Sequence, residues 1–340
     1  MSAAHSEGVW QAAWRRLRTD RVGLVALGVV VGFVGLIALC ALGLVARGWQ
    51  AEVGVPSAPP SFIGPLAKTE AAVVAQPGTE FKLDIADVDP LAPRYAEWAE
   101  RASRYTTLEP ALRTTLPFGA DRLGRDVLAK AAKGTQTSVF VGLLGAIVAT
   151  LIGTLLGALA GFFGGRVGDF LEWLYSVFTS IPDILLILSF AVLLGRGIAS
   201  VAIILALVGW TGMYRQVRAE FMKHGGREYV RAAEAIGASA ASRMFRHILP
   251  NVSHVILVRM SLLVVGFIKF EVILSYLGLG VAVDDVSWGT MLAEAQSELI
   301  LGHWWQLVAA TLFMAIFVTA FSLMTDALRD ALDPKLRGLE

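Results

Sequence analysis

The amino-acid sequence predicts an all-α membrane protein with six transmembrane helices. Of its 340 residues, 56% are hydrophobic and 17% are charged, and the mean hydropathy is +0.63. A soluble domain carries about 25% charged residues. The apolar residues are concentrated in long runs, so lipid must be the solvent for much of the chain. The six runs cover residues 22–46, 139–163, 170–194, 198–210, 252–274 and 305–324.

Residues 22–46 form the first predicted span and contain no charged residue. At about 1.5 Å per residue, such a helix is roughly 37 Å long and exceeds the hydrocarbon core of about 30 Å. A cleaved secretory signal is the alternative, because Arg15, Arg16, Arg18 and Arg21 precede the run. The apolar core of a signal is only about 7–15 residues long and a small-residue cleavage site follows it. We therefore favour a retained membrane anchor.

Lysine and arginine residues in the short connections predict the orientation, because they accumulate on the cytoplasmic side. With a cytoplasmic N-terminus, that side receives Arg166, seven basic residues between the fourth and fifth spans, and the basic C-terminal tail. The short outer connections then contain Arg196 alone. We expect both tails, residues 1–21 and 326–340, in the cytoplasm.

Residues 47–137 form the only large segment outside the spans, and this orientation places them on the outer, periplasmic side. The segment holds nine of the twelve prolines, so its first part should be irregular chain. A short helix is expected where Tyr95, Trp98, Ala102 and Tyr105 recur at spacings of three and four. This stripe could contact a partner or a substrate, although packing on its own protein or at the membrane interface is the simpler interpretation.

The second span carries a small residue at every fourth position. Helices in lipid associate through close van der Waals contact, which a stripe of small residues permits. We expect this helix to pack tightly against another helix of this chain or of a partner; random glycine enrichment is the alternative. The stripe consists of Gly145, Ala149, Gly153, Gly157, Gly161 and Gly165.

Pro182 and Asp183 lie in the middle of the third span. The proline should kink the helix, because it removes one backbone hydrogen bond. A charge at the bilayer centre costs about 2.5–3.5 kcal/mol, so Asp183 should face protein or water. It could line a translocation path or pair with a neighbouring helix. Arg259, Lys269 and Glu271 in the fifth span raise the same question, although long side chains can reach an interface.

Sequence motifs for catalysis and metal binding are absent. The chain has no G-x-x-x-x-G-K-[ST] loop for ATP phosphates, no G-x-S-x-G and no H-E-x-x-H, and its five histidines lack metal-ligand spacing. The single cysteine, Cys40, excludes an internal disulfide. No basic stripe with interleaved aromatic residues indicates nucleic-acid binding. We expect no enzyme activity, no metal and no cofactor in this chain, so it moves solute down a gradient or takes energy from another subunit.

Residues 228–251, between the fourth and fifth spans, predict a short helix with small residues on one face, a bend at Gly237 and a second short helix closed by Pro250. Small residues on an exposed cytoplasmic helix let another protein approach its backbone. The alternative is an interfacial helix that lies on lipid headgroups.

In this segment Ala232-Ala233, Gly237 and Leu249-Pro250 resemble the E-A-A loop of ABC importer permeases. Three other stretches resemble the dipeptide/oligopeptide branch of that family, and the resemblance covers about residues 117–335. The first position of the triplet, Arg231, departs from the family pattern, as do Ala120 and Asp169. The three stretches are Gly119-Ala-Asp-Arg-Leu-Gly-Arg-Asp-Val-Leu128, Tyr276-Leu-Gly-Leu-Gly280 with Ser287-Trp-Gly-Thr-Met-Leu292, and Leu328-Arg-Asp-Ala-Leu-Asp-Pro-Lys335.

The resemblance implies a type I ABC importer permease in the bacterial inner membrane, with a five-helix core at residues 138–325. It implies a heterodimer with a homologous six-helix permease, two cytoplasmic ATPase subunits that bind ATP and Mg²⁺, a periplasmic solute-binding protein and alternating access. Asp183 is the candidate for the translocation path. The expected ATPase contacts are Tyr229, Val230, Ala232, Ala233, Ile236, Gly237 and Pro250.

Two other classes of function have less support from the sequence. A secondary transporter needs paired titratable groups near the midplane and an internal repeat, whereas this sequence has one central carboxylate and no evident repeat. A membrane-anchored receptor or scaffold needs a core in its outer segment, and residues 47–137 show no obvious one. The sequence does not distinguish dipeptide, oligopeptide, peptide antibiotic, nickel chelate or sugar conjugate as the solute.

Overall fold

The computed structural model describes residue 15 and residues 18–65, 89–104 and 112–332. The chain divides into two compact units, one formed by Met1–Gln50 with Val127–Glu340 and the other by Ala51–Asp126. The second unit falls inside the segment 47–137 that the sequence sets apart. Each unit is described by itself.

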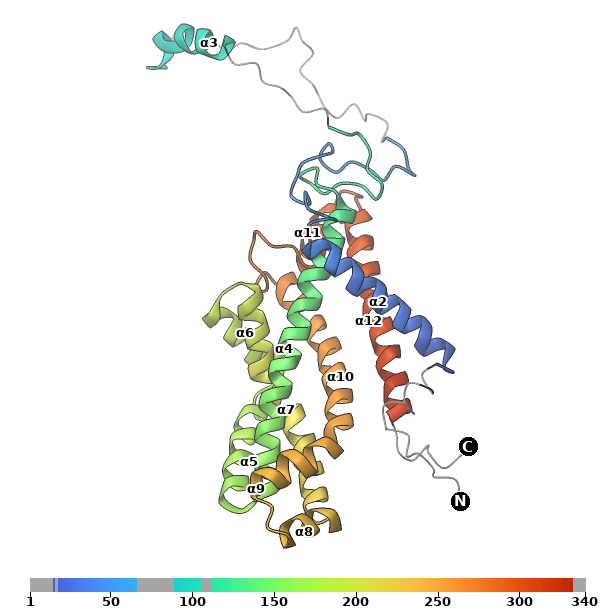
Figure 1. The fold of residues 1–340 in the computed structure, drawn as a ribbon. Coiled ribbons are helices and arrows are strands. Elements are labelled where there is room, and N and C mark those ends of the chain that lie inside the picture. Colours follow the sequence, from blue (N-terminus) through green and yellow to red (C-terminus); the bar gives the residue numbers. More distant parts are fainter. Residues whose placement is uncertain (1–14, 16–17, 66–88, 105–111, 333–340) are drawn as a thin grey trace. The chain divides into compact units, whose positions relative to one another are not determined.

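The larger unit is built from helices (Figure 1). Five of them are the long helices α2, α4, α7, α10 and α12, and shorter helices connect these. α8 and α9 lie at one end of α4, α7 and α10, and α11 lies at the other end (Figure 1). The elements are α2 (Arg21–Ala41), α4 (Val127–Phe163), α5 (Gly165–Thr179), α6 (Asp183–Leu194), α7 (Ile198–Gly225), α8 (Glu228–Ala235), α9 (Ala240–Ser242), a π-helical segment (Arg243–Ile248), α10 (Leu249–Tyr276), α11 (Trp288–Ile300) and α12 (Trp305–Leu332).

Four described helices, α2, α4, α7 and α12, are long and apolar enough to cross a membrane. α5 and α6 pass the same test as a pair, so the number rises to five if this pair is one span. α10 contains the expected fifth span and is 28 residues long, but it is not among these helices and carries three charged residues. The expectation of an all-helical membrane protein is confirmed in this coarser form.

The third expected span, residues 170–194, differs most from the sequence prediction. Instead of one kinked helix, the chain forms α5 and α6 with axes 83° apart. Pro182 is extended, with φ −56° and ψ 131°, and α6 begins at Asp183. The prediction of a kink was wrong in degree, because the helix breaks completely between Thr179 and Asp183.

Other helix boundaries also differ from those predicted for the spans. α2 ends at Ala41 and not at residue 46, and α4 begins 12 residues before the expected position 139. α7 continues through Tyr214 to Gly225, so the short fourth run is part of a 28-residue helix. The sequence did not predict α11, which lies in the expected outer connection before the last span.

α4 and α7 pack backbone against backbone along the glycine stripe of α4. A Cβ atom added to Gly153 would lie 2.6 Å from the carbonyl oxygen of Trp210. At Gly157 it would lie 2.7 Å from the carbonyl oxygen of Tyr214, and at Gly161 2.5 Å from that of Arg218. Gly145 also faces α7, where its added Cβ would lie 3.2 Å from the carbonyl oxygen of Ala202. Only glycine permits an approach this close.

The last expected member of the stripe, Gly165, does not continue it. It is the first residue of α5 and has φ +48°, and Gly164 before it has φ +58°. These two glycines make the turn between α4 and α5, because other residues rarely adopt such backbone angles.

The motifs at residues 276–292 pack the end of α10 against α11. An added Cβ on Gly289 would lie 2.5 Å from the carbonyl oxygen of Val272, and one on Gly280 would lie 2.0 Å from Ser275 Oγ. Ser287 caps α11 in a capping box with Thr290. The glycine and serine positions of these motifs are therefore required by helix packing and by a helix start.

Buried polar side chains at this end are hydrogen-bonded to one another. The fully buried Glu271 accepts a hydrogen bond of 2.7 Å from Ser275 Oγ. Lys130, with 1% of its side chain exposed, lies 2.5 Å from Glu294 and 3.2 Å from the amide oxygen of Gln306. The second network joins α4, α11 and α12, and pairing offsets the cost of removing charge from water.

The smaller unit has a small apolar core of Ala58, Leu116 and Ala120, which the sequence did not predict. The fully buried Asp121 accepts a hydrogen bond of 2.6 Å from Arg125 Nε. An added Cβ on Gly124 would lie 2.1 Å from the carbonyl oxygen of Gly54. The part of the motif at residues 119–126 therefore packs against residues 54–58 of the same unit.

The expected aromatic helix of this unit is α3 (Tyr95–Ser103). Tyr95 and Trp98 are exposed, and Tyr105 lies outside the described residues. The Tyr95 hydroxyl donates a hydrogen bond to Asp89, which lowers the pKa of this carboxyl below its ordinary value.

The contact between α4 and α7 predicts that Gly157→Ala destabilises the protein. The added methyl group would overlap a backbone carbonyl, and overpacking of this kind costs about 1–3 kcal/mol. We expect a lower Tm for the purified protein in detergent. The matched control is Gly28→Ala on α2, where an added Cβ meets nothing within 4 Å. An unchanged Tm for Gly157→Ala would contradict the packing described.

Candidate functional site

The segment after α7 forms an elbow, which we define as α8, the turn at Gly237 and α9. Gly237 has φ +87° and ends α8. Its N–H donates to the carbonyl of Glu234 at 2.9 Å, and the N–H of Ala238 donates to the carbonyl of Ala233 at 3.0 Å. These two bonds form a Schellman motif, which satisfies the last carbonyls of the helix and requires a left-handed residue after it. An added Cβ on Gly237 meets nothing within 4 Å, so crowding does not require glycine at this position. The positive φ angle favours glycine there.

The second arm of the elbow returns the chain to the membrane helices. Ser239 Oγ accepts a hydrogen bond of 3.2 Å from the N–H of Ser242 and so caps α9. The π-helical segment follows, and Pro250 occupies the first turn of α10, where its missing N–H costs no hydrogen bond. Arg243, in the π-helical segment, connects to α8 through its guanidinium, which lies 2.5 Å from Glu234. The same group lies over the ring of Phe162 of α4, 5.3 Å from the ring centre.

The structure divides the expected contact residues into two groups. Val230 and Ala233 are 2% and 4% exposed. Val230 lies in an apolar cluster that also contains Val217 and Phe221 of α7 and Ile248 before α10. Neither side chain presents much surface in this chain, and their expected direct contact with an ATPase subunit stays a prediction. They anchor α8 to its own chain.

The remaining expected residues are exposed, four of them on the elbow and Pro250 in the first turn of α10. Tyr229 is 37% exposed and Ile236 is 86% exposed, and Ala232, Gly237 and Pro250 are also exposed. Tyr229 Oη shares a hydrogen bond of 2.8 Å with His224 Nδ1, and burial raises the pKa of the Tyr229 hydroxyl above its ordinary value. Its hydroxyl therefore stays protonated at neutral pH.

Asp183, the residue expected on a translocation path, lines a cavity of about 200 Å³ between α6, α7 and α10. Arg259 of α10 lines the same cavity. Within the described chain neither residue forms a salt bridge within 4.0 Å, and Arg259 Nε is buried without a hydrogen-bond partner. The structure thus places two opposite charges in one cavity without pairing them.

Two glycines of α7 make room for this arrangement. An added Cβ on Gly212 would lie 2.6 Å from Arg259 Nη2, and one on Gly209 would lie 2.2 Å from the ring of Phe267. Sequence reasoning missed both glycines. The only signal was their spacing of three inside an apolar run, which also occurs by chance in membrane helices.

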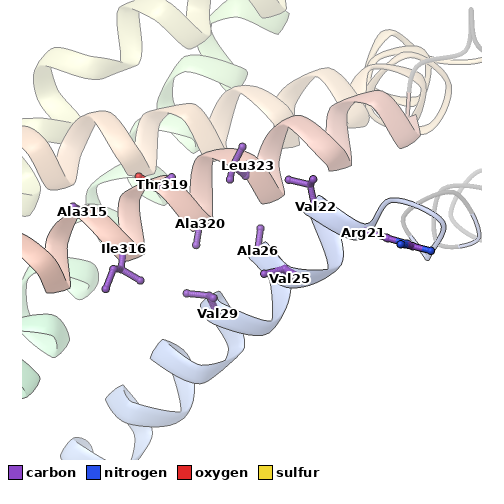
Figure 2. Close-up of a pocket in the computed structure, with 10 residues that line it drawn as sticks. All are labelled: Arg21, Val22, Val25, Ala26, Val29, Ala315, Ile316, Thr319, Ala320 and Leu323. Carbon is purple, nitrogen blue, oxygen red and sulfur yellow. The ribbon is translucent and has the colours of Figure 1, made fainter.

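A larger apolar groove lies between α2 and α12. It has a volume of about 620 Å³, and Val25, Ala26 and Val29 of α2 face Ile316 and Ala320 of α12 across it (Figure 2). Arg21 stands at its end, and apolar atoms provide almost all of its lining (Figure 2). This lining suits contact with a membrane or another apolar helix.

The elbow and the cavity lie in a part of the chain that resembles known proteins. The family model described as "Binding-protein-dependent transport system inner membrane component" matches residues 153–338. This range contains the elbow, α10, α11 and the cavity.

Several curated proteins are similar to the chain. It is 37% identical over 220 residues to the dipeptide transport system permease protein DppC of Bacillus subtilis, which covers 65% of this chain and 69% of that protein. It is 36% identical over 249 residues to the oligopeptide transport system permease protein OppC of Escherichia coli K12, covering 73% and 82%. It is 29% identical over 326 residues to DppC of Lactococcus lactis, covering 96% and 90%.

The burial of Val230 predicts that Val230→Ala loosens the elbow. Removing two buried methyl groups costs about 2 kcal/mol. We expect faster hydrogen–deuterium exchange in α8, measured by mass spectrometry on the purified protein. The matched control is Ile236→Ala, which removes apolar atoms from an exposed side chain of the same elbow and should leave the exchange unchanged. Equal exchange in the two variants would show that Val230 does not anchor α8.

Proposed function

The chain belongs to the family of binding-protein-dependent transport system inner membrane components, in its dipeptide and oligopeptide branch, and from this we propose that it is one permease subunit of an ATP-driven importer of peptides or peptide-like solutes. In this proposal a homologous six-helix subunit completes the transmembrane pathway. Two cytoplasmic ATPase subunits bind ATP and Mg²⁺, and a periplasmic binding protein delivers the solute. The chain itself carries no catalytic chemistry.

The elbow is the observation that carries this proposal. A device that receives force needs a surface that another protein can reach and a rigid connection to the spans. Tyr229, Ala232, Ile236 and Gly237 provide the exposed surface, and Val230 provides the connection. The next residues of the chain lead directly into α10, so displacement of the elbow must displace the ends of α7 and α10 together.

We propose that α10 is also a span and that α5 and α6 together form another, so that six spans are α2, α4, α5 with α6, α7, α10 and α12. The charges of α10 do not exclude this role. Glu271 is buried in protein, Arg259 lines a cavity, and Lys269 is exposed on the surface of this single chain. A lysine in a span should face protein or water, so we assign the face around Lys269 to the second permease subunit or to the pathway.

The positive-inside rule then places the elbow in the cytoplasm, and α11 with the preceding loop on the outer side. Both termini are cytoplasmic in this arrangement. The apolar surfaces of α2 and α12 face the membrane lipid or the second subunit.

Single-cysteine labelling tests the orientation. The one native cysteine, Cys40, is buried at 5% exposure, so Cys40→Ser should provide a functional background. In this background we expect Val283→Cys to react with a membrane-impermeant maleimide in spheroplasts. Ile236→Cys, of similar exposure, should react only after the membrane is permeabilised. The opposite pattern would reverse the topology and remove the elbow from the cytoplasm.

Substitution of the exposed face tests coupling. We expect Ile236→Asp to lower solute-stimulated ATP hydrolysis and uptake by about tenfold or more, because a buried unpaired charge at an interface costs at least 1–3 kcal/mol. Gly237→Pro should have the same effect, since proline cannot adopt φ +87°. The measurement is uptake and ATPase activity of the assembled complex in proteoliposomes.

The matched control for coupling is Val283→Asp, which has 82% exposure compared with 86% for Ile236 and lies beside Asp284 and Asp285. It should retain activity. Normal uptake by Ile236→Asp at a normal membrane level would contradict the proposed coupling role.

A further inference from the structure

We propose that the cavity between α6, α7 and α10 binds the terminal carboxylate of the transported peptide through Arg259, an inference that rests on the proposed function. The cavity is not part of the elbow. Its charged lining residues are Arg259 and Asp183, and the rest of its lining is mostly apolar. The geometry around Arg259 carries the inference.

Arg259 lies deep in its helix. It is ten residues from the first residue of α10, Leu249, which is about 15 Å along the helix axis. A charge at this depth is costly in lipid, so a side chain kept there needs a partner or a water-filled space. Two buried charged groups of the helices have partners within the chain. Glu271 accepts a hydrogen bond from Ser275, and Lys130 lies 2.5 Å from Glu294.

Arg259 differs from these groups because, among the described residues, it lines a cavity and forms no salt bridge within 4.0 Å. Gly212 leaves room for the guanidinium, since an added Cβ would lie 2.6 Å from Nη2. The guanidinium lies against the backbone of α7 at Gly212, and a methyl group at residue 212 would displace this end of the flexible side chain. Its Nε is buried and has no hydrogen-bond partner in the described chain. A planar fork of donors held in this way suits a carboxylate, which can accept two parallel hydrogen bonds.

The size and lining of the cavity indicate which part of a solute would enter. Its volume of about 200 Å³ is below the roughly 300–1,000 Å³ of pockets that enclose whole small molecules. It can receive one end of a longer solute. Leu263, Phe267 and Phe270 on α10 and Ile187 on α6 supply apolar contact for a terminal side chain of any sequence.

Asp183 completes the electrostatics. This exposed carboxylate gives the cavity a second charge of opposite sign and an acceptor for an N–H group of the solute. Peptides differ in their side chains, but all carry a carboxylate and N–H groups. Recognition by this pair would therefore be independent of peptide sequence.

The experiment compares trialanine with its C-terminal amide, at concentrations that saturate the binding protein with either peptide. Import is measured with the complete complex in proteoliposomes, for wild type, Arg259→Gln and Gly212→Ala. We expect wild type to import trialanine at least about tenfold faster than the amide, because the amide lacks the charge-assisted hydrogen bonds. Arg259→Gln should abolish this preference, and Gly212→Ala should reduce it by displacing the guanidinium.

The matched control is Gly266→Ala, which adds a methyl group to the same cavity where it meets nothing within 4 Å. It should keep the wild-type preference. An unchanged preference in Arg259→Gln, an equal loss of both peptides, or no preference in wild type would each overturn the inference while leaving the permease assignment intact. Failure of wild type to import either peptide would instead contradict the proposed function itself.

Discussion

Close backbone contact between α4 and α7 is the constraint on which the rest of the larger unit depends. At Gly153, Gly157 and Gly161 an added Cβ would lie 2.5–2.7 Å from carbonyl oxygens of α7, so the two helices are as near as their backbones allow. In lipid the hydrophobic effect does not drive helices together, so close van der Waals contact of this kind stabilises their association. α7 is therefore held along its length, and both functional features are built on it. Its C-terminal end holds the elbow, and Gly212 in its middle lies against Arg259.

Apolar burial and backbone hydrogen bonds hold the elbow more strongly than charge does. Burying a valine such as Val230 contributes about 1.5–3 kcal/mol. The pair between Glu234 and Arg243 contributes less, because the Glu234 side chain is 60% exposed and water screens it. The Schellman bonds at Gly237 then fix the angle between the two arms. The elbow therefore presents an exposed face and is anchored to its own chain by Val230, as the proposed coupling role requires.

The charged residues of the helices fall into two kinds. Lys130 and Glu271 are buried, hydrogen-bonded within the chain and placed where α4, α10, α11 and α12 meet, so they specify how these helices pack. Asp183 and Arg259 line a cavity without a salt bridge between them. Charge that is deep but unpaired is costly, and it persists where function requires it. Helix packing accounts for Lys130 and Glu271, whereas the role proposed for Asp183 and Arg259 is recognition.

The sequence by itself determined the class of protein, the glycine stripe of α4 and the position of the bend at Gly237. These features depend on composition and on helical periodicity, which are local properties of the chain. Only the tertiary structure decided that the proline-containing span breaks by 83°, because the size of a bend depends on what packs around it. It also decided which face of α8 is buried. Spacing places Val230 and Ala233 on one side of a helix, but it cannot say whether that side meets its own chain or another protein. The cavity at Arg259 belongs to the same category, since it forms only where α10 packs against α6 and α7, which precede it in the sequence.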